Sequence, residues 1–482
     1  MAGQARPSPP DPSAGPAGGV VRLPGTVRPV ARLVLPVLAE QFLGLSVGFV
    51  DKWLAGNLFA EAGPLAAVGL VAYCLAFMPV LFVVPAAAAT ALVSRHVGAG
   101  DVPGARRALA QCFVVATLAV VAMLLLAAVV GRHLVTALGL PPESSRLAAG
   151  YLGIVLPALP AMMVIQIGVA GLRGAGHMVA GLVAMTVVNL VNAVASFALA
   201  TGLWGLPRLG WEGLAWGTFA GYLCGAACVG FLLATDTGGL RPLPGDWRPN
   251  REWLRRITRV GVPAGADAAG NAVCHLTFLS IVNRLGDLNA AAHAVAVTIE
   301  SLAFLPGSAF QVAAATLAGQ FLGGRDERRA RASVGQAAAA CCCLMTAAGA
   351  GFYLWADPLA AWFVGGSDAQ PGVASLAAAL VRIVAFAQPP LALLMVLSGG
   401  LRGAGATRPP MLVNLVGLVV IRLPLAAILA WPSISLPAGL GVIEGFGMAA
   451  RGAWLAMAVD LSARGLAMLV IFSRTDWTRA RV

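Results

Sequence analysis

Among the carboxylates that lie inside long apolar stretches of this sequence, Asp51, Asp267 and Glu300 are candidates for chemistry. On membrane-insertion scales a charged side chain in such a position costs at least ~2.5–3.5 kcal/mol, so its presence requires a reason. A protonated carboxyl is neutral and lets a bent helix reorganise, whereas the ionised form can bind a cation. Pro306 follows Glu300 by six residues, removes a helical hydrogen bond and frees a carbonyl nearby. These residues predict a site that responds to protons or to a metal cation.

Each of these carboxylates also has a structural interpretation. Asp51 lies beside Lys52 and could be a solvated interfacial residue. Asp267 has glycine and alanine neighbours and no local partner, although Asn271 lies one helical turn further on and shares its face. Glu300 could simply hydrogen-bond a neighbouring helix.

The rest of the chain has the composition of a membrane protein. Of its 482 residues 59% are hydrophobic and 11% are charged, whereas a soluble domain carries about 25% charged residues. Backbone groups in hydrocarbon must satisfy one another, which leaves helices or closed barrels. The apolar runs are long and do not alternate, so helices are favoured. We therefore predict an all-α polytopic membrane protein.

Twelve apolar stretches are long enough to span a bilayer. They lie near residues 31–54, 64–94, 106–131, 146–171, 178–203, 211–234, 253–283, 290–320, 333–356, 374–400, 409–431 and 444–473. When the intervening segments are assigned alternately to two sides, one side holds 23 basic residues and the other 6. The positive-inside rule then places both termini in the cytoplasm. It also accounts for the net charge of +12 without a nucleic-acid partner.

The two halves of the sequence are related. Leu172-Arg173-Gly174-Ala175-Gly176 recurs as Leu401-Arg402-Gly403-Ala404-Gly405, 229 positions later, and Phe77-Met78-Pro79 is echoed by Phe304-Leu305-Pro306. Each half holds an even number of spans, so both enter the membrane in the same orientation. We therefore predict twelve transmembrane helices in two parallel-repeat six-helix lobes around a central cavity. The two glycine-containing boxes are expected to form tight cytoplasmic turns that hold Arg173 and Arg402.

Charge and turn residues divide the chain further. The predicted organisation is a disordered cytoplasmic tail at 1–29, an N-lobe with spans 1–6 at 30–235, a cytoplasmic linker at 236–251, a C-lobe with spans 7–12 at 252–475 and a cytoplasmic tail at 476–482. Prolines inside spans predict bent helices. They are Pro36, Pro79, Pro85, Pro157, Pro160, Pro306, Pro389 and Pro390.

Several short motifs, specific only in combination, carry a family resemblance. They are Leu35-Pro36 followed by Asp51, the two Leu-Arg-Gly-Ala-Gly boxes, Gly261-Val262-Pro263, the segments 299–306 and 319–324, and Val420-Ile421-Arg422-Leu423-Pro424-Leu425. Over about residues 30 to 475 the chain resembles the multidrug and toxic compound extrusion (MATE) transporters, in the branch that includes the DinF-like bacterial proteins.

The resemblance implies a secondary active antiporter of the bacterial inner membrane and no enzymatic activity. It would export amphipathic, often cationic small molecules in exchange for inward H⁺ or Na⁺ by alternating access, as a monomer that needs no cofactor besides the coupling ion. Asp51 and Asn192 match an N-lobe ion site of the family, but Ser196 stands where a second acid is expected. Many relatives place a glutamate at the position of Asn271, so Asp267 would serve the same space from one turn away. No metal site is certain, and Na⁺ at Asp51 or Asp267 is an option.

Other side chains are candidates for lining the cavity, because aromatic and methionine side chains suit flat cationic ligands. They are Tyr73, Phe77, Met78, Met163, Gln166 and Gln388, with ordinary helix packing as the alternative for each. Asp460 and Arg464, one turn apart, are expected to form a structural pair. Arg422 is expected to snorkel towards an interface.

Two other functions remain open. A flippase for lipid-linked sugars would share the scaffold but would need a cationic cavity, and interior arginines are few. A polytopic membrane enzyme would need clustered histidine, aspartate or serine side chains, whereas the five histidines are scattered along the chain.

Overall fold

The computed structural model describes residues 25, 27–58, 71, 75, 78–137, 142–365, 371–435 and 442–480, and within these ranges the side chains at 45–52, 55–58, 130–137, 142–145, 371 and 435 are left undescribed. Asp51 therefore has a backbone position in the first helix but no described side chain. Tyr73 and Phe77 lie outside the described residues.

The first half of the chain is helical throughout its described part. Its elements are α1 (Val27–Leu58), the 3₁₀ turn η2 (Met78–Phe82), α3 (Val83–Gly98), α4 (Val102–Ala137), α5 (Pro142–Val155), η3 (Leu156–Ala158), α6 (Leu159–Gly174), α7 (Val179–Thr201), η4 (Leu203–Gly205) and α8 (Trp211–Ala234). The short turns η5 (Thr237–Gly239) and η6 (Pro244–Trp247) connect it to the second half.

The second half repeats this order of spans and adds a short helix, a π-helix, two short strands and a C-terminal 3₁₀ turn. Its elements are α9 (Arg251–Asn283), α10 (Asp287–Gly323), α11 (Glu327–Leu354), α12 (Ala356–Val364), α13 (Pro371–Ala385), α14 (Gln388–Gly403), α15 (Arg408–Val416), the π-helix η7 (Gly417–Arg422), α16 (Leu423–Ala430), β1 (Ser433–Ser435), β2 (Val442–Glu444), α17 (Ala449–Arg474) and η9 (Trp477–Arg479).

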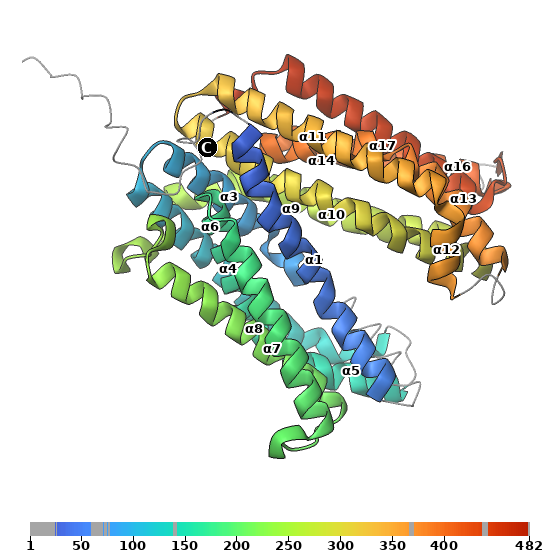
Figure 1. Cartoon of the computed structure of the whole chain (residues 1–482), viewed down its shortest axis with the longest axis horizontal. Helices are drawn as coiled ribbons and strands as arrows, with labels where there is room; N and C mark the ends of the chain where they lie inside the picture. Colours follow the sequence, from blue (N-terminus) through green and yellow to red (C-terminus); the bar gives the residue numbers. More distant parts are fainter. Residues whose placement is uncertain are drawn as a thin grey trace, which may run out of the picture.

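The predicted twelve-helix, two-lobe architecture is confirmed. Among the described residues nine helices are long and apolar enough to cross a membrane, and α13 with α14, bent by 54°, makes a tenth. The remaining two spans are α1 and α9, with 32 and 33 residues, which are the first helices of the two lobes. In Figure 1 the two bundles meet near α3 and diverge towards α5 on one side and α12 on the other.

Two of the predicted bends correspond to interruptions at equivalent places in the two lobes, whereas α1 and α10 continue through Pro36 and Pro306 as single helices. The fourth span breaks into α5 and α6 at a 3₁₀ turn that contains Pro157. The tenth span breaks between α13 and α14, just before Pro389 and Pro390. Proline removes a backbone donor and clashes with the preceding turn, which accounts for the interruption of both helices at these positions.

The region before the last span differs from the prediction. Residues 433–435 and 442–444 pair as an antiparallel hairpin, with Ser433 opposite Glu444, and the last helix begins at 449 rather than near 444. Pro432 stops the preceding helix because its ring has no N–H to donate. The short helix α12 was also not predicted as a separate element.

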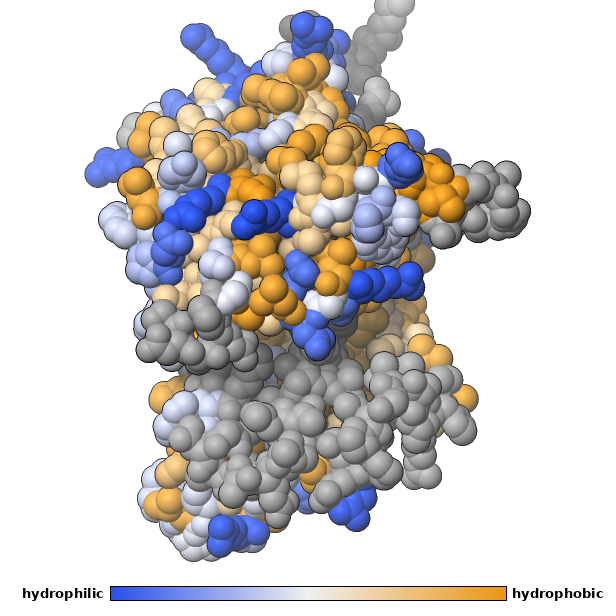
Figure 2. Space-filling model, turned by 90° about the vertical axis from the view of Figure 1, so that its right-hand side faces the viewer, coloured by the Kyte–Doolittle hydropathy of each residue, from blue (hydrophilic) through white to orange (hydrophobic). Residues whose placement is uncertain are grey.

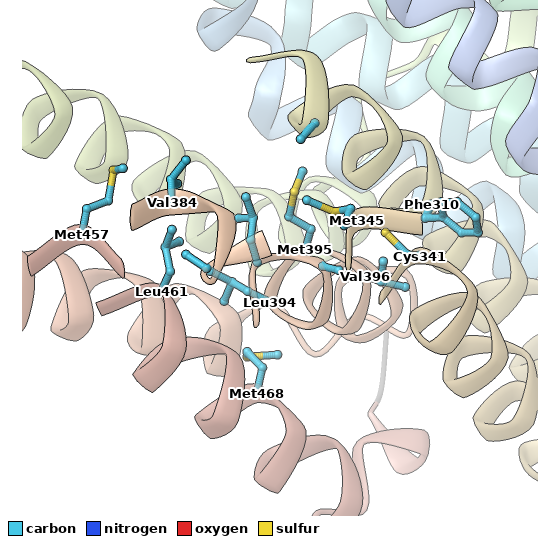
Figure 3. Packing of buried hydrophobic residues seen from close by; sticks show 14 of the residues in the cluster. Phe310, Cys341, Met345, Val384, Leu394, Met395, Val396, Met457, Leu461 and Met468 are labelled. Atoms are coloured by element: carbon cyan, nitrogen blue, oxygen red, sulfur yellow. The ribbon is translucent and has the colours of Figure 1, made fainter. Parts of the chain in front are cut away.

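The buried apolar side chains form two clusters, one centred in each lobe, and α1 contributes to the C-lobe cluster while α9 contributes to the N-lobe cluster. Much of the remaining apolar surface faces outward. Figure 3 shows the C-lobe core, where Met345 of α11 and Met395 of α14 lie close together while Leu461 and Met468 extend from α17. In Figure 2 hydrophobic side chains also cover much of the visible surface. In the most apolar stretch of α4 only 22% of the residues are buried. Exposed apolar helix surface of this kind is what lipid tails contact.

A glycine stripe packs α8 closely against α7. Gly213, Gly217, Gly221 and Gly225 recur every four residues, and a Cβ on any of them would lie within 2.8 Å of an α7 atom. Small residues at this spacing let two membrane helices approach until their backbones touch. The stripe therefore fixes the geometry of the fifth and sixth spans.

Replacing Gly217 with valine is expected to destabilise the protein by about 1–3 kcal/mol, because overpacking forces the helices apart. The added Cβ would lie 2.4 Å from the backbone nitrogen of Ser196. Gly230 is the matched control, since it belongs to the same helix and a Cβ there meets no atom within 4 Å. Thermal unfolding in detergent measures both variants. Equal melting temperatures for the two would contradict the proposed role of the stripe.

Candidate functional site

The two Leu-Arg-Gly-Ala-Gly boxes form the predicted tight turns, and the two turns have the same geometry. In each turn the N–H of the last glycine of the box donates to the carbonyl oxygen of the arginine, from Gly176 to Arg173 and from Gly405 to Arg402. The N–H of the residue that follows this glycine donates to the carbonyl oxygen of the leucine that opens the box. Gly176 has φ +93° and Gly405 has φ +88°, a left-handed conformation that favours glycine. The repeated sequence thus encodes a repeated backbone structure that presents Arg173 and Arg402 in equivalent positions.

In the C-lobe the turn's arginine is paired with a predicted site residue. The Arg402 guanidinium forms an ion pair with the carboxylate of Asp267 in α9. Asn414 of α15 donates to both oxygens of the same carboxylate, at 3.0 and 3.2 Å. Asp267 is 4% exposed, and its oxygens are taken up by these partners, so the arrangement does not fit a Na⁺ ligand. Asn271 is exposed and is not part of this contact.

The N-lobe contains an equivalent pair that sequence reasoning missed. Arg173 forms an ion pair with Glu40 of α1, and Gly181 of α7 leaves the space into which the Glu40 carboxylate fits. Glu40 follows Pro36 by four residues, as Asp267 follows Pro263. The offset of 227 between the two prolines also relates the two acids, so the internal repeat itself carried the signal.

The same turns join the two lobes. Thr316 and Gln320 of α10 donate to the carbonyl oxygens of Arg173 and Gly174, at 3.1 and 2.8 Å. In the opposite direction, Arg95 of α3 donates to the carbonyl oxygen of Ala404 at 3.3 Å. We call this contact, formed by the two turns with Arg95, Thr316 and Gln320, the inter-lobe seal. Both turns lie at the same end of the molecule, as parallel repeats require.

The seal tolerates little added volume or charge. A Cβ on Gly319 of α10 would lie 1.8 Å from the hydroxyl of Ser94 in α3. His177 follows the N-lobe turn, and burial together with the charge of Arg32 lowers its pKa. The imidazole is therefore neutral at neutral pH and adds no charge to the seal.

A second buried ionic cluster lies deeper in the C-lobe. Asp460 is fully buried and accepts from Arg422 Nε at 2.8 Å and from Arg464 Nε and Nη2 at 2.9 and 2.6 Å. The predicted Asp460–Arg464 pair is thus confirmed. The predicted snorkelling of Arg422 is wrong, because its side chain donates inward to Asp460 and only 9% of the residue is exposed.

The eleventh span is adapted to this cluster. Residues Gly417–Arg422 form a π-helix, which ends at the arginine that reaches Asp460. A Cβ on Gly417 would lie 2.3 Å from the Arg464 side chain, so glycine leaves the space that Arg464 occupies. A π-turn inserts one residue into a helix and is frequent at functional sites.

Asn414 connects the two ionic groups. Its amide nitrogen donates to Asp267, and its amide oxygen accepts from Arg464 Nη1 at 3.2 Å. A continuous chain of contacts therefore runs through the C-lobe, from the inter-lobe seal to the π-helix. We call it the C-lobe network, and its members are Arg402, Asp267, Asn414, Arg464, Asp460 and Arg422.

Glu300 lies beside this network and differs from the other buried carboxylates. It is half-buried in α10 and interacts electrostatically with Arg422. Among the described residues it has no hydrogen-bond or ion-pair partner, whereas Glu40, Asp267 and Asp460 are each paired with arginine. Of these four carboxylates, Glu300 is thus the one without an arginine partner among the described residues.

The N-lobe candidate Asn192 lies in a neutral cluster between α7 and α8. It donates to Thr218 Oγ1 at 3.0 Å and to Ser196 Oγ at 3.4 Å, and the Tyr151 hydroxyl bonds the same Thr218 at 2.9 Å. Ser196, which replaces the expected acid, is fully buried in this cluster. The described part of the N-lobe cluster therefore contains no carboxylate, and the side chain of Asp51 is outside the described residues.

The cavity candidates do not converge on one described site. Met78 and Gln388 are buried in their own lobes, and Gln166 is exposed. Met163 lines a cavity of about 380 Å³ between α4, α6, α8 and the linker, together with Trp247. No group of three or more histidine, cysteine, aspartate or glutamate side chains that could hold a metal gathers in the described part of the chain.

Two lobes of six spans, parallel repeats that meet at paired turns, and buried carboxylates in the spans define a polytopic membrane transporter. The chain belongs to the MatE family, whose model matches residues 36–198 and 263–428. The two matched segments begin at the equivalent residues Pro36 and Pro263. Proteins of this family are transporters and not enzymes.

Known proteins resemble the chain over nearly its full length. It is 24% identical to a probable multidrug resistance protein NorM of Thermotoga maritima, over 95% of both chains. It is 29% identical to one of Pseudomonas aeruginosa, over 95% of this chain and 90% of the relative. A solved multidrug resistance MATE family transporter of the MOP superfamily, in an outward-facing conformation, matches with a TM-score of 0.81 at 20% identity, over 92% of this chain and 94% of the other. These matches support a bacterial inner-membrane protein. The finer DinF-like placement stays a prediction.

Proposed function

We propose that this protein exports amphipathic, mainly cationic small molecules from the cytoplasm in exchange for inward H⁺ or Na⁺. Relatives of the chain are named multidrug resistance proteins NorM and PmpM, which supports efflux of foreign compounds. The bilayer and a small-molecule substrate are then its partners, and a monomer suffices because each chain carries both lobes.

The observation that carries the proposal is that Glu300 has no hydrogen-bond or ion-pair partner in the part of the chain that the structure describes. A charged side chain in the membrane costs at least ~2.5–3.5 kcal/mol, and an arginine partner offsets that cost for Glu40, Asp267 and Asp460. Glu300 lacks such a partner among the described residues, so a proton or a metal cation can neutralise it and leave again. We therefore assign the coupling role to Glu300 in the C-lobe.

The orientation follows from charge. The inter-lobe seal lies at the end of the molecule where Arg95, Arg173 and Arg402 cluster. By the positive-inside rule this end faces the cytoplasm. Gly25 before the first span and Thr475 after the last lie at the start of α11, where their carbonyl oxygens accept from Arg329 and Arg331. The state described here is then closed towards the cytoplasm.

A flippase for lipid-linked sugars is the weaker alternative. A pyrophosphate-bearing substrate needs uncompensated cationic side chains in the cavity. The arginines buried within the described spans are instead engaged by carboxylates, namely Arg173 by Glu40, Arg402 by Asp267, and Arg422 and Arg464 by Asp460. This arrangement favours a substrate that carries positive charge or none.

Reconstituted proteoliposomes test the proposal directly. Uptake of ethidium, a flat cationic dye, is measured while the Na⁺ gradient and the pH gradient are varied independently. One of the two is expected to drive accumulation, and each pH unit supplies ~1.4 kcal/mol to a one-for-one proton exchange. That exchange moves no net charge, so a potassium–valinomycin potential should leave its rate unchanged. If neither gradient drives uptake of ethidium or another cationic dye, the antiport function is wrong.

A further inference from the structure

We propose that the C-lobe network transmits the charge state of Glu300 to the inter-lobe seal, with Asn414 as the positioning residue that makes the transmission possible. This inference rests on the proposed function, in which Glu300 binds the coupling ion. It adds the route by which that binding reaches the part of the molecule that must open.

The charges of the network explain why Glu300 matters to it. The network contains the cations Arg402, Arg464 and Arg422, and the carboxylates Asp267 and Asp460, so it carries one excess positive charge. An ionised Glu300, which interacts with Arg422, balances that charge. A neutral Glu300 leaves the excess uncompensated in a medium of low dielectric constant, where such an imbalance is costly.

The geometry indicates how the imbalance moves. Arg422 and Arg464 both bind Asp460, so they compete for one carboxylate. When Glu300 is neutralised, Arg422 depends on Asp460 alone and weakens the hold of Arg464. Arg464 then shifts its charge towards Asn414, whose amide already bridges to Asp267. An arginine drawn to Asp267 competes with Arg402 for it.

Arg402 connects this competition to the seal. It lies in the turn whose next-but-one residue, Ala404, accepts the hydrogen bond from Arg95 of the other lobe. A Cβ on Gly403 of the same turn would lie 1.9 Å from the Ala315 carbonyl of α10, so the turn is packed tightly in place. Loss of the Asp267–Arg402 pair would free this turn. Neutralisation of Glu300 then favours opening to the cytoplasm, the direction in which the coupling ion must leave.

The N-lobe has an equivalent acid–arginine pair at its turn, but in the described residues it lacks the contacts that would connect this pair to a second ionic cluster. Glu40 and Arg173 form the equivalent pair, yet α7 carries no counterpart of Asn414 that contacts Glu40 among the described residues. Asn189 of α7 donates only to the carbonyl of Met185 in its own helix, at 2.8 Å. The asymmetry identifies the C-lobe as the responsive half and supplies a matched control residue.

Other titratable groups near Glu300 do not replace this route. His275 of α9 interacts electrostatically with Arg422. His293 of α10 accepts a hydrogen bond from Trp454 Nε1 at 3.1 Å. Neither histidine contacts Asp267 or Asn414. Among the described residues, the charged group that interacts with Glu300 is Arg422 of the π-helix, which is itself a member of the network.

The test measures opening of the seal by electron–electron double resonance. Spin labels are placed at Ala99 and Arg328, both exposed beyond the ends of α3 and α10, after the eight native cysteines are replaced by alanine. The Glu300→Gln variant mimics the neutral side chain and is expected to raise the fraction with separated labels about tenfold. Adding Asn414→Leu should return that fraction to the wild-type level, Asn414→Gln should preserve the response, and Asn189→Leu should have no effect.

Each outcome is decisive. A label separation in Glu300→Gln that persists unchanged with Asn414→Leu overturns the relay while leaving the role of Glu300 intact. A seal that opens in Asn414→Leu alone, whatever the state of Glu300, assigns Asn414 a purely structural role and also overturns it. If Glu300→Gln neither separates the labels nor alters ethidium transport, the coupling role of Glu300 fails and the relay fails with it, whereas the proposed export function fails only if neither ion gradient drives dye uptake by the unmodified protein.

Discussion

Glutamine at position 300 is expected to lower ion-driven ethidium uptake at least about tenfold, while dye binding changes less than about threefold. The substitution keeps the shape of the side chain but removes its ability to bind and release a proton or to hold Na⁺. The protein would then be fixed in the form that has already received its ion. Transport in proteoliposomes and dye binding to the purified protein, measured side by side, separate these two effects.

The matched control for this experiment is Asp287→Asn. Asp287 begins the same helix, α10, and is exposed at its first residue. Removing its charge should leave transport unchanged, because water already solvates it. Wild-type exchange in the Glu300→Gln variant, with sound expression, would remove Glu300 from the mechanism and would direct attention to Asp51.

The lobes and the turns could be predicted from sequence because they depend on local or periodic signals. Apolar runs set the spans, and the repeated box set two turns of identical geometry. The pairing of Asp267 with Arg402 could not be predicted in this way, since the two residues are 135 positions apart and meet only in the folded C-lobe, where α9 packs against α15, the helix that follows the Arg402 turn. Composition shows that a buried carboxylate needs a partner, but it does not show which partner.

Glu40 and the π-helix illustrate two different limits. The role of Glu40 could have been predicted from the sequence, because the offset that relates Pro36 to Pro263 also relates Glu40 to Asp267. The π-helix could not have been predicted from the sequence, because it inserts one residue into a span whose apolar pattern is otherwise continuous. The apolar pattern alone therefore predicts a snorkelling Arg422 that extends towards an interface. The register shift is what turns Arg422 towards Asp460.

Replacing Asp460 with asparagine is expected to destabilise the protein by about 3–5 kcal/mol, because two buried guanidinium groups would lose their shared carboxylate. Thermal unfolding in detergent measures the change. The control is Asp357→Asn, since Asp357 pairs with Arg382 at an exposed site where an ion pair contributes about 0–1 kcal/mol. Equal melting temperatures for the two variants would show that the loss of the Asp460 carboxylate costs no more than the loss of an exposed one, which would contradict the prediction.

A triple variant separates stability from coupling. Asp460→Leu combined with Arg422→Met and Arg464→Met removes all three buried charges at once, and such replacements are often neutral or stabilising relative to the ion cluster. We expect the triple variant to melt well above Asp460→Asn yet to lose ion-driven transport, because Glu300 would no longer have a charged group through which to act. A stable triple variant that still exchanges ions for ethidium would contradict this result. If methionine and leucine can replace Asp460, Arg422 and Arg464 without loss of stability, these charged residues serve the response to the coupling ion and not the stability of the fold.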